Sequence, residues 1–112
     1  MESRLIKFIF DKKDKNEVYE WASFLNSKNE AVIEILEEEC VFAEEAYIEE
    51  VEDCINIYFY WAGEDLDKAS EISQKNKNEI NNFHRNFILT FRKKAIKIEN
   101  LFRFHTYGKL KK

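Results

Sequence analysis

A chain of 112 residues with 45% hydrophobic and 15% aromatic residues can bury a core, so the sequence predicts one folded domain over residues 1–112 and excludes intrinsic disorder. Proline is absent and glycine occurs only twice, which excludes glycine-rich phosphate loops and the nucleotide and flavin motifs that depend on them. The net charge is −4, but residues 1–56 hold 16 acids and 6 bases while residues 57–112 hold 6 acids and 12 bases.

The first half of the chain begins with a strand and a helix. Residues 5–10 alternate in hydrophobicity, which predicts a strand with Ile6, Phe8 and Phe10 on one face. Asp14 followed by Glu17 fits a capping box, and a helix is expected from Lys15 to Glu38. The polar run at residues 26–29 could bend that helix.

Residues 41–51 and the stretch CINIYFYWAGEDL, residues 54–66, predict a β-hairpin. A two-residue turn at Glu52-Asp53 pairs positions that sum to 105, so that Tyr47 faces Tyr58. The other pairs in this register are Glu45 with Tyr60, Ile48 with Ile57, Ala46 with Phe59, and Glu44 with Trp61. The same register holds Cys40 and Cys54 too far apart for a disulfide, so two free thiols are expected.

The second half predicts two helices and a last strand. A short helix is expected to begin near Asp65 and to bury Leu66, Ala69 and Ile72. After a polar break, a longer helix carries one apolar stripe and ends in a basic turn; the stripe consists of Ile80, Phe83, His84, Phe87, Phe91, Ala95 and Ile98. Residues 101–107, LFRFHTY, alternate as a fourth strand.

The order β-α-β-β-α-α-β predicts an α+β ferredoxin-like domain, a four-stranded antiparallel sheet with helices on one face. The most apolar rows belong under the helices: Ile6/Phe8/Phe10, Ala46/Ile48, Ile55/Ile57/Phe59/Trp61 and Phe102/Phe104. The opposite face mixes aliphatic, tyrosine and charged residues, a composition typical of an interface. We expect a homodimer through Ile9, Tyr47, Tyr58, Tyr60, Leu101 and Arg103.

The segments EEAYIEE (44–50), IYFYW (57–61) and EDLDKA (64–69), together with His84, resemble an uncharacterised bacterial domain family. That family belongs to the dimeric α/β-barrel group of ferredoxin-like proteins, and the resemblance covers roughly residues 4–107. The group also includes sugar mutarotases and small antibiotic-biosynthesis-type monooxygenases. The resemblance implies two sheets packed face to face in a homodimer, and a small-molecule pocket between sheet and helices of one subunit.

His84 and Glu44 are polar residues expected on the core side of the sheet. An imidazole beside a carboxylate could perform general acid–base chemistry, with Glu44 orienting His84. The alternative is a core histidine bonded to the backbone and a solvated Glu44 at the end of its strand. Trp21, Trp61 and Phe83 could wall a pocket there, or could be ordinary core residues.

Other ligands find less support. Arg103 and His105 could bind an anion, but a pairing of Arg103 with an acid such as Glu45 across the dimer seam is favoured. Tyr58 and Tyr60 beside Lys7 could stack RNA bases, but five nearby glutamates would repel phosphates, so nucleic acid is not expected. No metal-ligand spacing occurs, and no cofactor is expected.

The sequence therefore predicts a homodimeric binding or structural module that acts through its sheet face. The alternative is a small-molecule enzyme, mutarotase-like or cofactor-free monooxygenase-like, with a pocket between sheet and helices. No apolar run reaches 18 residues and no signal peptide is recognised at the N-terminus, so a cytoplasmic location without a membrane span is expected. The charge asymmetry is best explained by an acidic hairpin lying beside a basic last helix; a surface for self-association or for an anion is the alternative.

Overall fold

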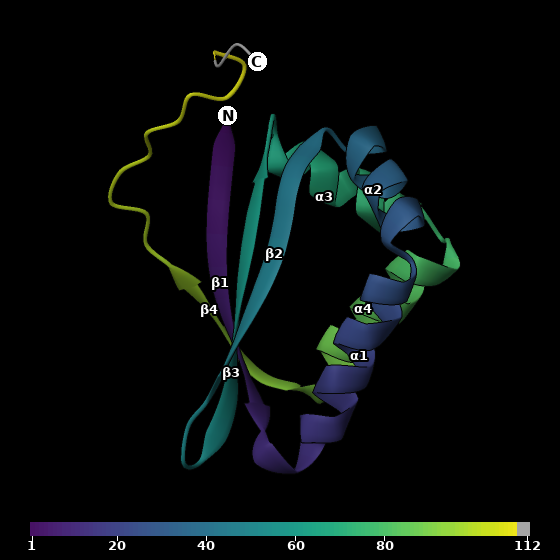
Figure 1. Ribbon diagram of the computed structural model, residues 1–112, viewed down its shortest axis with the longest axis vertical. Coiled ribbons are helices and arrows are strands. Elements are labelled where there is room, and N and C mark those ends of the chain that lie inside the picture. Colours follow the sequence, from purple (N-terminus) through teal and green to yellow (C-terminus); the bar gives the residue numbers. More distant parts are fainter. Residues whose placement is uncertain (110–112) are drawn as a thin grey trace.

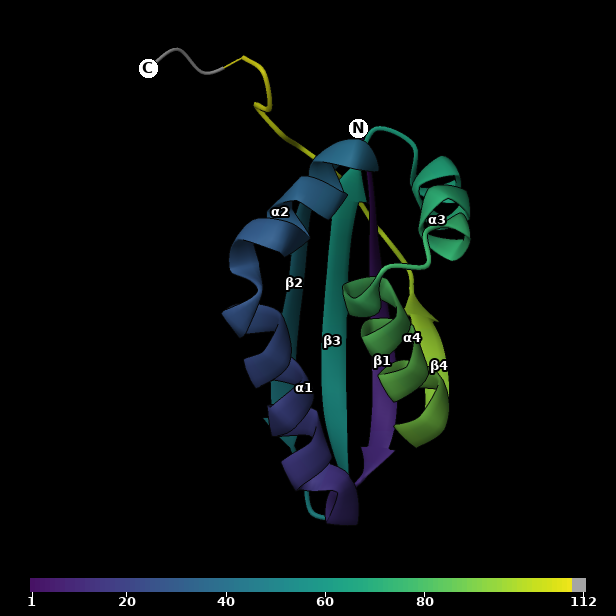
Figure 2. The same cartoon turned by 90° about the vertical axis from the view of Figure 1, so that its right-hand side faces the viewer.

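The computed structural model describes residues 1–109 as two layers, a four-stranded sheet and a layer of helices (Figure 1). The elements in chain order are β1 Glu2–Asp11, the 3-10 turn η1 Lys12–Asp14, α1 Lys15–Ser27, α2 Asn29–Glu38, β2 Val41–Glu50, β3 Cys54–Gly63, α3 Leu66–Lys75, α4 Glu79–Phe91 and β4 Arg92–Ile98. All neighbouring strands are antiparallel in the order β2-β3-β1-β4. The α+β ferredoxin-like fold with helices on one face is confirmed (Figure 2).

The hairpin register is confirmed. β2 and β3 pair Tyr47 with Tyr58, Glu45 with Tyr60 and Glu44 with Trp61, and the other two predicted pairs also hold. Alternate side chains of the hairpin therefore point to opposite faces of the sheet as expected, with the tyrosines on one face and Trp61 on the other. Cys40 and Cys54 are free thiols, as expected.

The core lies between the helix layer and the central strands β1 and β3. Its largest cluster combines residues of β1 and β3 with residues of α1 and α4: Phe8, Phe10, Val18, Trp21, Ile55, Ile57, Phe87 and Ile88. The expected rows on β1 and β3 thus pack under the helices. The row on β2 does not, because this edge strand has only one neighbour and its second half is exposed, including Ala46 and Ile48.

The expected helix over residues 15–38 is divided at Lys28 into α1 and α2, within the polar run that was expected to bend it. The predicted capping box is wrong, because the Asp14 side chain accepts no capping hydrogen bond. α3 begins where expected: the Asp65 carboxylate accepts a bond from Lys68 N at 3.1 Å. Glu2 of β1 also accepts a bond from Leu66 N at 2.7 Å, which fixes the start of α3 against the sheet.

The predicted position of the last strand is wrong. α4 ends at Phe91, and β4 begins directly at Arg92 and pairs with β1. The stripe that suggested a longer helix continued to Ala95 and Ile98, but both residues lie in β4. A strand here satisfies the backbone groups along the free edge of β1, which a longer helix would leave without partners.

Residues 99–107, called here the C-terminal arm, form an extended segment outside the sheet. The arm leaves β4 on the side of the sheet away from the helices and runs toward the N-terminus (Figure 1). Leu101, Phe102 and Phe104 are 85%, 70% and 87% exposed, so Phe102 and Phe104 do not lie under the helices as expected. None of the helices in residues 1–109 is long and apolar enough to cross a membrane.

The charge asymmetry also has a different explanation from the expected one. The acidic β2 and the basic β4 lie at opposite edges of the sheet, and the bases expected in a last helix belong to β4. On the open face, defined as the sheet face away from the helices, Glu45 and Glu49 lie on β2, whereas Lys7 and Lys94 lie on β1 and β4. The open face is therefore negative at one edge and positive toward the other.

Candidate functional site

A cavity of about 510 Å³ lies between the sheet and the helices α1, α2, α3 and α4. Most of its wall is apolar and comes from β1, β3 and the helices: Ile6, Phe8, Leu25, Val32, Ile35, Leu36, Phe59, Trp61, Ile80, Ile88 and Leu89. Its polar wall includes Glu39, Glu44, Asn81, His84 and Arg85. An apolar chamber with a few convergent polar groups is the usual form of a small-molecule site.

His84 lies on α4 and reaches the cavity from the helix layer. The Trp21 indole lies nearly parallel to the imidazole with the ring centroids 5.7 Å apart, and Trp21 Nε1 donates a hydrogen bond to His84 Nδ1 at 3.0 Å. Burial, with a smaller contribution from Arg85, lowers the pKa of His84 to about 4. At neutral pH the ring is therefore uncharged, and because Nδ1 accepts a bond, the proton resides on Nε2.

Glu39 and Glu44 are the acidic groups of the cavity. Glu39 is the C-cap residue of α2 and is only 6% exposed, whereas Glu44 lies on β2 opposite Trp61. Burial, helped by the neighbouring Glu38 charge, raises the pKa of Glu39 to about 7. Burial, helped by Glu39, raises the pKa of Glu44 to about 7. Both carboxyls are therefore poised to exchange protons near neutral pH.

Three buried polar atoms on the cavity wall lack a hydrogen-bond partner within residues 1–109: Glu39 Oε2, Trp61 Nε1 and Asn81 Nδ2. Buried polar groups are normally paired, because an unpaired one costs about 1–3 kcal/mol. One acceptor and two donors of the wall residues are thus unsatisfied, and each of the three atoms is covered by neighbouring protein atoms. Arg85 Nη2 donates to the Ser73 carbonyl at 2.6 Å, and its guanidinium keeps its positive charge on the cavity wall.

The structure brings His84, Glu44 and Trp61 to one cavity. Trp21 orients His84 through its hydrogen bond, a role that the sequence analysis had assigned to Glu44. Within the described part of the chain, no hydrogen bond joins His84 to Glu44. Phe83 does not line the cavity and is 37% exposed, with its ring 4.2 Å from that of Phe24.

Glu39 was missed by the sequence analysis, although a signal for it existed. Val32, Ile35, Leu36 and Glu39 follow the i, i+3, i+4, i+7 spacing of one helix face. A glutamate that continues an apolar stripe at a helix C-terminus also opposes the helix dipole, which is a costly position for a charge. Such a residue is a candidate for a functional carboxyl.

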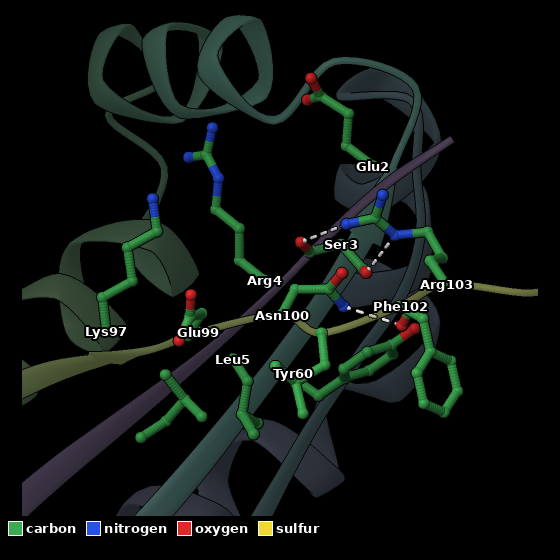
Figure 3. Close-up of a pocket in the computed structure, with 12 residues that line it drawn as sticks. Glu2, Ser3, Arg4, Leu5, Tyr60, Lys97, Glu99, Asn100, Phe102 and Arg103 are labelled. Carbon is green, nitrogen blue, oxygen red and sulfur yellow. Dashed lines mark hydrogen bonds between the residues drawn. The ribbon is translucent and has the colours of Figure 1, made fainter.

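The residues expected at a dimer interface occupy two places. Ile9, Tyr47, Tyr58 and Tyr60 lie on the open face, where Glu49 accepts hydrogen bonds at 3.0 Å from both Asn56 and the Tyr58 hydroxyl. Leu101 and Arg103 belong to the C-terminal arm. Arg103 Nε donates to Ser3 Oγ at 2.6 Å and Nη2 to the Ser3 carbonyl at 3.1 Å (Figure 3).

A second cleft, of about 880 Å³, lies between the arm, the first residues of β1 and the end of β4. Figure 3 shows Arg103 bonded to Ser3 and Asn100 bonded to the Phe102 carbonyl along the arm, with Tyr60 and Leu5 from the open face among the residues that line the cleft. The arm is thus tied to its own sheet through Ser3 but leaves space against it. Within residues 1–109, no group of three or more His, Cys, Asp or Glu residues is placed to hold a metal ion.

The fold and the cavity define an α+β ferredoxin-like domain with a largely apolar, partly ionisable cavity between its layers. The chain belongs to the family of unknown function DUF6176, whose match covers residues 1–109. No curated protein and no solved structure matches this chain.

Proposed function

We propose that this domain binds a small organic molecule in the cavity between its sheet and its helices. The observation that carries the proposal is the set of unpartnered polar atoms of Glu39, Trp61 and Asn81 on an otherwise apolar wall. A bound molecule that pairs with these atoms would recover the free energy that their burial costs. The resemblance to the dimeric α/β-barrel group implies a pocket in the same place.

The two tryptophans provide a direct test of this proposal. Trp61 Nε1–H has no partner within the described residues, whereas Trp21 Nε1–H is already bonded to His84. We expect small aromatic amines, acids or alcohols that enter the cavity to shift the indole N–H resonance of Trp61 in an NMR titration, with a much smaller shift at Trp21. Ser70→Leu narrows the cavity and should abolish the shift, whereas Ser23→Leu on the exposed side of α1 should preserve it.

The result against ligand binding is equally clear. If no member of a probe set moves the Trp61 resonance, or if Ser70→Leu and Ser23→Leu respond alike, the cavity is not a binding site.

A mutarotase-like or cofactor-free monooxygenase-like activity is the catalytic form of the same proposal. His84 and Glu44 both reach the cavity, and a carboxyl with a pKa near neutrality is suited to moving protons. In its neutral form His84 would act as a hydrogen-bond donor through Nε2, so the role of base falls to Glu44 or Glu39.

The free thiols of Cys40 and Cys54 fit a reducing compartment such as the cytoplasm.

The open face and the arm support a second proposal, a homodimer. Tyr47 is 59% exposed, and the apolar side chains of the arm are more exposed still. Charge suggests how two copies would meet: a two-fold axis parallel to the strands sets the β2 edge of one copy over the β4 edge of the other. Glu45 and Glu49 of each copy would then face the side that carries Lys7 and Lys94 in its partner.

Sedimentation equilibrium at micromolar concentration should give about twice the 13.5 kDa of one chain. Tyr58→Glu places a second carboxylate beside Glu49 in the seam and should weaken the dimer by about a hundredfold or more. Tyr19→Glu, on the exposed side of α1, should leave the mass unchanged. A wild-type mass of one chain, or a dimer that tolerates Tyr58→Glu, would exclude this interface.

A further inference from the structure

The cavity contains two carboxyls and no paired cation. Within residues 1–109 the ion pairs lie elsewhere, between Arg4 and Asp67, Lys15 and Glu50, and Lys93 and Asp11. Arg85 is the basic residue of the cavity wall, and its guanidinium donates to the Ser73 carbonyl. Glu39 is 6% exposed, lines the cavity and leaves Oε2 without any partner. A buried carboxyl of this kind is normally paired with a cation or kept protonated.

The wall around these carboxyls suits the apolar part of a ligand. Trp61 faces Glu44 across the hairpin, and Phe59 lies two residues before it on the same face of β3. Aromatic faces attract cations, while aliphatic residues of α1, α2 and α4 complete the chamber. His84 adds a neutral ring and no competing positive charge, since burial keeps its pKa low.

Given the proposed small-molecule site, on which this inference rests, we propose that the cavity selects an organic cation. The ligand is a protonated amine attached to an apolar body, with the ammonium group held by Glu39 and Glu44. An ammonium group supplies hydrogen-bond donors to the unpartnered carboxyl oxygen and the positive charge that this pair lacks. An anionic head group would be repelled by both carboxylates once they ionise, and a neutral one would not stabilise their ionised forms.

This arrangement makes binding depend on pH in a defined direction. The charged groups that bear on the carboxyls are Glu38 beside Glu39 and the two carboxyls themselves, with Arg85 on the same wall and His84 neutral. In the free protein both carboxyls keep their protons up to a pKa of about 7. An ammonium group favours the ionised forms, so binding releases protons and the affinity rises as the pH increases through neutrality.

Three probes with one phenyl body and different head groups test the inference: 2-phenylethylamine, 2-phenylethanol and 3-phenylpropionate. We expect calorimetry at about pH 8 to show the amine binding roughly tenfold to a hundredfold tighter than the alcohol, the range of a charge-assisted hydrogen bond. At about pH 5.5 the preference should largely disappear, because the carboxyls are then protonated. Glu39→Gln and Glu44→Gln should each remove most of the preference at about pH 8, while Glu34→Gln on the exposed side of α2 should retain it.

The outcomes separate this inference from the proposed function. If the alcohol or the acid shifts the Trp61 resonance and the amine binds no tighter, the cavity is a ligand site but does not select cations. If none of the three probes binds and no other molecule shifts Trp61, both the inference and the proposed function fail. The pH dependence is measured on the unaltered protein, so the test does not rest on the folding of any variant.

Discussion

Trp21→Ala is expected to lower the free energy of unfolding by about 3–5 kcal/mol, the usual cost of truncating a large buried aromatic residue. Trp21 is 2% exposed, its ring lies 4.9 Å from that of Phe87 and nearly parallel to it, and its Nε1 donates a hydrogen bond to His84. Domains of this size are stable by only about 5–15 kcal/mol, so the variant should lose a large part of its stability. Urea denaturation followed by far-UV circular dichroism measures the effect.

A milder change separates packing from hydrogen bonding at the same position. Trp21→Phe retains an aromatic ring but removes the Nε1–H that His84 Nδ1 accepts, and should cost about 1–3 kcal/mol. Tyr19→Ala, at a position that is 47% exposed on the same helix, should cost less than about 1 kcal/mol. If Trp21→Ala lowers the free energy of unfolding no more than Tyr19→Ala does, then α1 does not pack on α4 through Trp21.

Glu44→Gln is expected to stabilise the protein at about pH 8 by roughly 3 kcal/mol and to have little effect at about pH 4.5. The ordinary pKa of a glutamate, 4.5, applies in the unfolded chain, whereas burial raises the pKa of Glu44 in the folded protein to about 7. The folded state therefore binds the proton more tightly, and this contribution to stability is complete below the unfolded pKa. It is lost as the pH rises through the folded pKa, because the carboxyl must then ionise inside the protein.

Glutamine stays neutral at every pH, so the variant avoids this loss. Urea denaturation at several pH values should show the stability of Glu44→Gln falling less than that of the natural protein between about pH 5 and pH 8. Glu34→Gln on α2 removes an exposed carboxylate and should follow the natural curve within about 0.5 kcal/mol. Parallel curves for Glu44→Gln and the natural protein would mean that Glu44 is ionised and solvated in the folded state.

The sequence predicts the hairpin well because two local signals agree there. The alternation of Ile55, Ile57, Phe59 and Trp61 and the two-residue turn both fix the same register, and a slip of one residue would reverse every side chain. β4 was misplaced because Phe91 and Ala95 extend a helical stripe. The free edge of β1, which draws Arg92–Ile98 into the sheet, is a tertiary effect that local periodicity does not contain.

Local periodicity also predicted part of the candidate site, while the contacts that depend on tertiary packing were not predicted. Strand alternation put Glu44 beside Trp61, and helical spacing put His84 on the inner face of its helix, so both reach the cavity. The hydrogen bond between Trp21 and His84 joins residues 63 positions apart in the sequence. No spacing rule indicates that the two residues meet, or which imidazole nitrogen accepts the bond. Glu39 reaches the cavity only because α2 is a separate helix that ends over β2.

The most direct test of this account is an NMR titration of the side-chain carboxyl carbons of Glu39 and Glu44 in the ligand-free protein. We expect the pair to titrate with midpoints near the pKa of about 7 that burial gives each carboxyl. Midpoints near the ordinary glutamate value of 4.5 would show that both carboxyls are solvated, and would contradict a cavity whose buried carboxyls await a cation.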